Sequence, residues 1–124
     1  MTQEDKDLLL KDLSARLPYG VIMTNIELCE THYPLTCEDL HDAMYEEDWD
    51  DVPYLRPMSS MTEDEEKEYY ELYYDAPQFK NGWRDRRYLD GLHVDWLNAH
   101  HFDYRGLIEK GLAIAVTEEN NPYK

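Results

Sequence analysis

Apolar residues recur along the chain with helical spacing in several segments. A first stripe predicts a helix over residues 3–17 and comprises Leu9, Leu10, Leu13 and Leu17. Thr2 is suited to cap the start of this helix, and Pro18 is suited to end it. A second stripe predicts a helix over residues 88–100 and comprises Leu89, Leu92, Trp96 and Leu97. We expect the rest of the chain to pack around the stretch 88–116, which begins with this helix.

Two further helices are predicted from their termini. Thr62 and Glu65 have the spacing of a capping box, so a helix should begin there and run to about Asp75. Its buried side should comprise Tyr69, Leu72 and Tyr73. Asp103 is suited to cap a short helix over residues 104–110, and Lys110-Gly111 is typical of a helix end.

The remaining apolar segments favour strands. Residues 21–28 are rich in β-branched side chains and predict a strand, with residues 40–46 or 112–116 as its partner. We expect a turn over residues 29–37, with Pro34 at its tip. Pro53 and Pro57 bracket an extended segment, and residues 77–86 should be irregular or strand-like.

These elements together predict an α+β fold in which three to four helices pack on a small, mostly antiparallel sheet. A chain of 124 residues fits one domain, 1–124. We expect its polar end, roughly residues 118–124, to be a frayed tail.

Charge is distributed very unevenly along the chain. The net charge is −16. Residues 38–75 hold fifteen acids and two bases (net −13), whereas residues 76–124 hold seven of each. Such a field repels nucleic acid and anionic membranes and favours a protein with a basic surface. No membrane-length apolar run or signal-like start is present, so we expect a cytoplasmic protein.

Acidic residues and tyrosines in the middle of the chain form the candidate partner-binding surface. Clustered carboxylates suit a basic partner, and tyrosine is common at protein interfaces. The acidic run EEDWDD lacks the spacing of a calcium-binding loop. A solubilising surface is the simpler alternative. The candidate residues are Glu46, Glu47, Asp48, Asp50, Asp51, Glu63, Glu65, Glu66, Glu68, Tyr70 and Tyr74.

Four residues around the predicted turn form a candidate metal site. Cys29, His32, Cys37 and His41 have the order C-x2-H-x4-C-x3-H, which is similar to compact zinc sites. The opening Cys-x2-His is not the usual one, and a pair of semi-buried thiols with two surface histidines is the simpler interpretation. We therefore predict no bound cofactor.

The three histidines near the C-terminus suggest acid–base chemistry. His93 and His100 share one helix face but lie two turns apart, about 10 Å along the axis, which is too far for one metal ion. His101 points elsewhere, and Asp95 or Asp103 could orient an imidazole. A polar helix end is the alternative interpretation.

Three segments carry a resemblance to a known group of proteins. PYLRPMSSMTEDE (residues 53–65), VDWLNAHHFDYRGLIEKGLA (94–113) and the segment 8–21 resemble an uncharacterised family of short proteins from gut anaerobic bacteria and their phages. The resemblance implies a bacterial or phage setting and a small interaction protein. It implies no activity and no functional residues.

The function predicted from the sequence is therefore binding and not catalysis. We expect a non-enzymatic acidic interaction protein that binds a basic host protein. The specific function expected is inhibition of a defence enzyme or of an enzyme that acts on nucleic acid. A small metal-binding or hydrolytic protein is one alternative, and a homo-oligomeric binder of a small ligand is another. No Walker loop, GxGxxG, GxSxG or HExxH motif is present.

Overall fold

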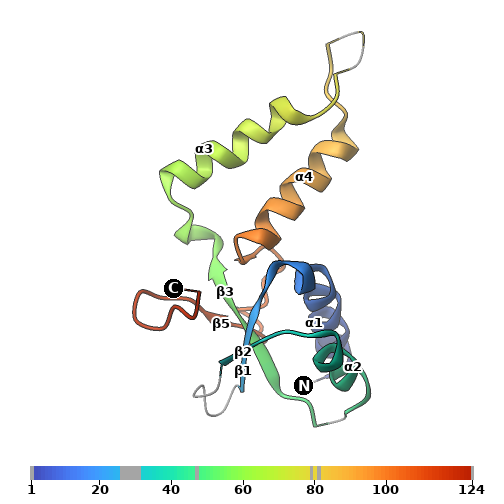
Figure 1. The fold of residues 1–124 in the computed structure, drawn as a ribbon, viewed down its shortest axis with the longest axis vertical. Helices are drawn as coiled ribbons and strands as arrows, with labels where there is room; N and C mark the ends of the chain where they lie inside the picture. Colours follow the sequence, from blue (N-terminus) through green and yellow to red (C-terminus); the bar gives the residue numbers. More distant parts are fainter. Residues whose placement is uncertain (1, 26–31, 47, 79, 81, 124) are drawn as a thin grey trace.

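The computed structural model describes residues 2–25, 32–46, 48–78, 80 and 82–123 (Figure 1). Its helices and strands follow in the order α1 (Gln3–Arg16), η1 (Leu17–Tyr19), β1 (Ile22–Asn25), β2 (His32–Pro34), α2 (Cys37–Tyr45), β3 (Asp51–Pro57), η2 (Met58–Ser60), α3 (Glu63–Glu71), η3 (Leu72–Asp75), α4 (Arg86–Ala99), β4 (Phe102–Asp103) and β5 (Ile114–Ala115).

Strand β3 is the centre of the sheet. It pairs antiparallel with β1, and β1 pairs antiparallel with the edge strand β2. Further along, β3 pairs in parallel with the short strands β5 and β4. The sheet is therefore mixed but mostly antiparallel, and the predicted α+β fold is confirmed.

The molecule consists of a body and an arm (Figure 1). In the body, α1 and α2 lie beside each other against the sheet, and the core includes Leu9, Leu13, Met23 and Leu55. Helices α3 and α4 extend away from the body side by side and form the arm, whose tip is the connection between them (Figure 1). A second, smaller core lies at the arm's base.

At the start of each of the two longest helices, the side chain of the N-cap residue accepts hydrogen bonds from backbone N–H groups of the first turn. The Thr2 hydroxyl accepts a hydrogen bond from the Asp5 N–H, as predicted for α1. Helix α4 begins two residues earlier than predicted, because the Asp85 carboxylate accepts from the N–H groups of Arg87 and Tyr88. Within α4, Leu89, Trp96 and Leu97 are buried as expected, whereas Leu92 is half-buried.

Two predictions for residues 29–46 are wrong. Residues 40–46, a candidate strand, instead form the end of α2 and its C-cap, Glu46, because a capping box between Thr36 and Asp39 starts a helix there. Residues 32–34 were expected in a turn but form β2, which supplies one partner of β1. Residues 112–116 do contribute a strand, yet β5 pairs with β3 and not with β1.

The predicted helix over residues 104–110 is also absent, and these residues form turns. The Asp103 carboxylate accepts hydrogen bonds from the N–H groups of Leu107 and Ile108, so it caps a turn and not a helix. Gly106 has a φ of 77°, a left-handed conformation that interrupts helical geometry.

The described end of the chain, through Tyr123, packs on the body instead of fraying. The Tyr123 hydroxyl donates to the Tyr54 carbonyl (2.6 Å) and accepts from the Ile22 N–H (3.1 Å). Upstream, the Asn120 side chain bonds Thr117 and the Ala115 carbonyl. Half-burial of a tyrosine with both hydrogen bonds satisfied stabilises this segment.

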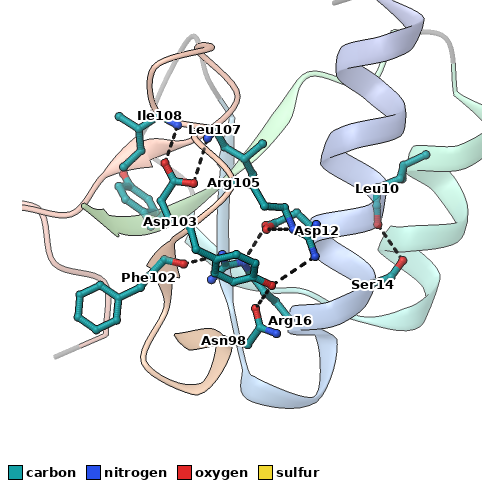
Figure 2. A network of polar contacts seen from close by, with 12 residues as sticks. Leu10, Asp12, Ser14, Arg16, Asn98, Phe102, Asp103, Arg105, Leu107 and Ile108 are labelled. Atoms are coloured by element: carbon teal, nitrogen blue, oxygen red, sulfur yellow. Dashed lines mark hydrogen bonds and ion pairs between the residues drawn. The ribbon is translucent and has the colours of Figure 1, made fainter. Parts of the chain in front are cut away.

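A fully buried ion pair fixes α1 to the start of the C-terminal region (Figure 2). The Arg16 Nε donates to Asp12 (2.7 Å), and both side chains have no exposed surface. The other end of the guanidinium donates to the Phe102 carbonyl (2.6 Å), and Arg105 approaches Asp12 from the opposite side (3.2 Å). The ion pair therefore connects α1 to Phe102 and Arg105, which lie 86 and 93 positions further along the chain than the residues that they contact.

Among the described residues, no helix has the length and apolar character needed to cross a membrane.

Replacing Arg16 by Met should destabilise the protein strongly. The Asp12 carboxylate would remain buried with only the partly exposed Arg105 beside it, so the free energy of unfolding should fall by about 3–5 kcal/mol in urea titrations. The double variant Asp12→Leu/Arg16→Met removes both charges and should recover most of the loss. A double variant as unstable as Arg16→Met would contradict this account.

His101 should make the protein less stable as the pH falls. Burial, followed by the neighbouring charges of Arg16, His100 and Arg56, lowers the pKa of His101 to about 4, and its ring stacks on Tyr123. The unfolded chain binds this proton near pH 6.5, so stability is lost as the pH falls from about 6.5 toward 4.

The variant His101→Asn should reduce this pH dependence. Asparagine tolerates the local φ of 63° and has no proton to gain in this range. Because the ring is not completely buried, the difference in slope between the two proteins should stay below about 1.4 kcal/mol per pH unit. Equal slopes in pH-dependent unfolding would show that His101 does not titrate as described.

Candidate interaction surface

The predicted acidic surface is divided between two distant parts of the molecule. Glu46 and Asp48 lie near the end of β3 that starts at Asp51, whereas α3 follows its other end (Figure 1). A strand of this length spans roughly 20 Å. Glu47 lies outside the described residues. The two acidic segments therefore do not form one continuous surface.

The segment before β3 uses most of its polar groups internally. Asp51 accepts from the Tyr33 hydroxyl (2.5 Å) and, with Asp50, from the Asn25 side chain. Burial, followed by the hydrogen bond and charge of Asp51, raises the pKa of Tyr33 and keeps its proton on. Trp49 donates to the Asp51 carbonyl. Asp50 and Asp51 thus hold this segment together, and the exposed acids there are Glu46 and Asp48.

Glu65 attaches α3 to the body. Its two carboxylate oxygens accept from the Arg56 guanidinium at 2.7 and 2.6 Å, and one of them also caps the Thr62 N–H. The Arg56 hydrogen bond is the largest effect that lowers the pKa of Glu65 to about 2. Arg56 also lies over the Phe102 ring, 4.1 Å from its centre. Glu65 is therefore a structural residue and is not free for a partner.

The side of α3 that faces α4 is occupied by aromatic contacts. Tyr69 stacks on His93 with ring centres 4.3 Å apart and meets the edge of Trp96. Glu68 accepts from the Trp96 indole N–H (2.9 Å), so this predicted partner-binding residue also holds the arm together. Burial is the main cause of the raised pKa of Tyr69. The predicted inward positions of Tyr69 and Leu72 agree with these contacts.

The opposite side of α3 faces solvent and retains four predicted residues. Positions three or four apart share one helix face. We call Glu63, Glu66, Lys67, Tyr70 and Tyr74 the outer stripe. All five are exposed; the side chains of Tyr70 and Tyr74 are 63% and 70% exposed. The outer stripe therefore begins with acids near the arm's base and continues with tyrosines toward its tip.

The arm's tip carries exposed aromatic and basic side chains that were not predicted as a site. Tyr73, expected to be buried, is 43% exposed because the helix tightens into η3, and Trp83 is 72% exposed. Together with Arg84 and Arg86 they line a hollow of about 380 Å³. Arg84 donates to the Ala76 carbonyl (2.9 Å) and lies over the ring of Tyr73.

Each of the C-terminal histidines stacks on a different aromatic ring. His93 stacks on Tyr69, His100 on Trp96 and His101 on Tyr123. The His100 Nδ1 also contacts the Trp96 carbonyl. The candidate orienting acids lie elsewhere: Asp103 is occupied by backbone N–H groups, and Asp95 is exposed. These rings pack the arm and the C-terminus, so they have a structural role.

The candidate metal ligands cannot be compared as a complete set, because Cys29 lies outside the described residues. His32 lies on β2 and contacts the Tyr54 hydroxyl (3.1 Å). Cys37 and His41 lie one turn apart on α2 beside a surface hollow of about 350 Å³. In the described part of the chain, no three potential ligands converge in a geometry that could hold a metal ion.

Comparison of the chain with known protein families, curated proteins and solved structures finds no match. The resemblance to short proteins of gut bacteria and their phages therefore stays a prediction.

Glu65 and Glu66 provide a matched pair for testing which acids are structural. Glu65→Gln weakens the ion pair with Arg56 and should lower the free energy of unfolding at pH 7 by about 1 kcal/mol, a value reduced for solvent screening. Because a depressed pKa stabilises the fold above pH 4.5, the difference should fade as the pH drops toward 2.

Glu66→Gln is the control, since this side chain is exposed and should change stability by less than about 0.5 kcal/mol. Denaturant titrations of both variants give the comparison. Equal effects would mean that the bond between Glu65 and Arg56 does not hold α3 in place.

Proposed function

We propose that this chain is a non-enzymatic interaction protein that binds a basic protein through the outer stripe of its arm. The concrete case is inhibition of a bacterial defence or nucleic-acid enzyme by a protein of bacterial or phage origin that acts in the cytoplasm. The observation that carries the proposal is the division of α3 into a side engaged in structural contacts and a side with exposed carboxylates and tyrosines.

The chemistry of the outer stripe suits such a partner. Exposed carboxylates attract a basic surface over long range and speed the encounter. Tyrosine rings then supply contact area at a small cost in conformational entropy, while their hydroxyl groups stay hydrogen-bonded at the rim. Carboxylates can also take the place of phosphates in a groove that otherwise binds a nucleic-acid backbone, and the outer stripe offers Glu63 and Glu66 for this.

The position of the outer stripe also supports the proposal. The arm extends beyond the body, so its outer side is accessible to a partner without rearrangement of the core (Figure 1). Glu65 and Glu68 hold that side in place through Arg56 and Trp96. A surface fixed in this way loses little conformational freedom on binding.

Affinity capture from a bacterial host lysate tests the proposal. Glu63→Lys/Glu66→Lys should lose the captured basic protein, because it reverses charge on the outer stripe without touching Glu65 or Glu68. Glu109→Lys/Glu118→Lys makes the same change in net charge at exposed positions of the body and should retain it. Capture by the wild type should weaken as salt rises.

A third variant separates the two acidic segments. Glu46→Lys/Asp48→Lys reverses charge at the other end of β3 and should also retain the captured protein. If all three double variants bind equally well, the acidic residues only keep the protein in solution. If only the Glu46/Asp48 variant fails, the binding surface lies on the body, and the proposed role of the arm is wrong.

A further inference from the structure

The two ends of the arm carry opposite charge. Helix α3 holds six acids and Lys67 (net −5, or −4 when Arg56, which pairs with Glu65, is included), whereas residues 80–87 at the tip hold four bases and Asp85 (net +3). The nine residues of α3 and the four of η3 together extend roughly 20 Å. The Debye length is about 8 Å at physiological salt, so the two ends do not neutralise each other within one molecule.

Exposed aromatic rings lie between these two charged ends. Tyr70, Tyr73, Tyr74 and Trp83 are 43–72% exposed. The rings of Tyr73 and Tyr74 meet edge to face, and Arg84 lies over both. Together these four side chains expose on the order of 500 Å². A stable interface buries about 800 Å² on each partner, so they could supply more than half of that area.

We propose that two copies of the chain form a dimer by pairing their arms in antiparallel orientation. A twofold axis near Tyr70 and Tyr74 would place the acidic start of each α3 against the basic tip of the other copy. Along one surface of the arm, acidic residues are followed by aromatic and then by basic residues. In a second copy of opposite orientation this order is reversed, so each acidic end faces a basic end. Such self-complementarity is the requirement for an isologous interface. Charge complementarity therefore favours a second copy of the chain as the partner that binds this surface.

The high net charge of the chain does not prevent this pairing. Antiparallel arms place the two bodies at opposite ends of the dimer, so the acids of the body segment around Glu46 and Asp48 lie far from the contact. At physiological salt, charges separated by more than about 8 Å are largely screened, and the local pairs between acidic and basic ends dominate. Dimerisation should therefore be stronger at physiological salt than at very low salt, where net repulsion reaches further.

Variants in which the charge at one end of the arm is reversed provide the test. The variant Glu63→Lys/Glu66→Lys replaces both carboxylates of the outer stripe by lysines next to Lys67, so the exposed start of the stripe becomes basic like the tip. The variant Arg86→Glu/Arg87→Glu changes residues 80–87 from net +3 to net −1, so the tip becomes acidic like α3. Each of these positions is exposed, and Arg84, which holds the tip together, is left unchanged. Sedimentation at physiological salt should give twice 14.9 kDa for the wild type and 14.9 kDa for each variant alone, with dimerisation weakened about tenfold or more.

A mixture of the two variants should restore the dimer. The basic ends of one variant meet the acidic ends of the other at both contacts, so an equimolar mixture should sediment as a heterodimer. Glu109→Lys/Glu118→Lys should dimerise like the wild type, and Tyr70→Ala/Tyr74→Ala should be monomeric. A wild type that stays at 14.9 kDa up to millimolar concentration, or a mixture that stays monomeric, would overturn the proposal.

The dimer and the proposed basic partner can be tested independently, although both use the outer stripe. The sedimentation experiment contains only purified protein, so its result does not depend on any partner. Conversely, Arg86→Glu/Arg87→Glu removes the dimer but leaves the outer stripe intact, and it should capture the basic protein at least as well as the wild type. Loss of capture by this variant would show that the partner recognises the dimer and not the single arm.

Discussion

The position of the arm depends on a charge buried inside the body. Arg16 has no exposed surface, and a guanidinium without water is very unfavourable unless its charge and N–H groups are matched. Asp12 matches the charge and the Phe102 carbonyl accepts from Nη2, so that among the described residues only Nη1 of this guanidinium is left without a hydrogen bond. Because Phe102 follows α4 almost directly, this arrangement fixes where α4 leaves the body.

A second arginine completes the attachment of the arm. Arg56 lies at the end of β3, receives Phe102 against its guanidinium and binds Glu65 at the start of α3. Its backbone N–H donates to the His101 carbonyl. Both helices of the arm are thus joined to the same strand region, and the contacts among Tyr69, His93 and Trp96 hold them to each other. The exposed side of α3 is the side that these contacts leave unused.

Much of this architecture could be predicted from short stretches of sequence. Thr2 and Thr62 start helices through neighbours three residues away, and the leucines of α1 show their apolar face directly. Helix α2 is harder to predict, because its capping box has Asp39 at the position where glutamate or glutamine is usual. The turns after Asp103 are hard to predict because Gly106 interrupts a segment that otherwise has helical spacing.

The candidate surface was less predictable, because exposure depends on distant partners. Nothing in the sequence near Glu65 or Glu68 indicates that Arg56 and Trp96 engage them. The packed C-terminus likewise depends on a bond from Tyr123 to the carbonyl of Tyr54, 69 positions earlier. The aromatic tip around Trp83 lies in a segment with no regular pattern, and its exposed tryptophan was the one available signal.

Radical footprinting of the tyrosines, read by mass spectrometry, tests most directly that the outer side of α3 is the working surface. The monomeric variant Arg86→Glu/Arg87→Glu should be labelled strongly at Tyr70 and Tyr74 and weakly at Tyr33 and Tyr123. In the wild type at high concentration, labelling at Tyr70 and Tyr74 should fall while that at the other two stays unchanged. Equal labelling of Tyr70 and Tyr74 in both proteins would contradict the account.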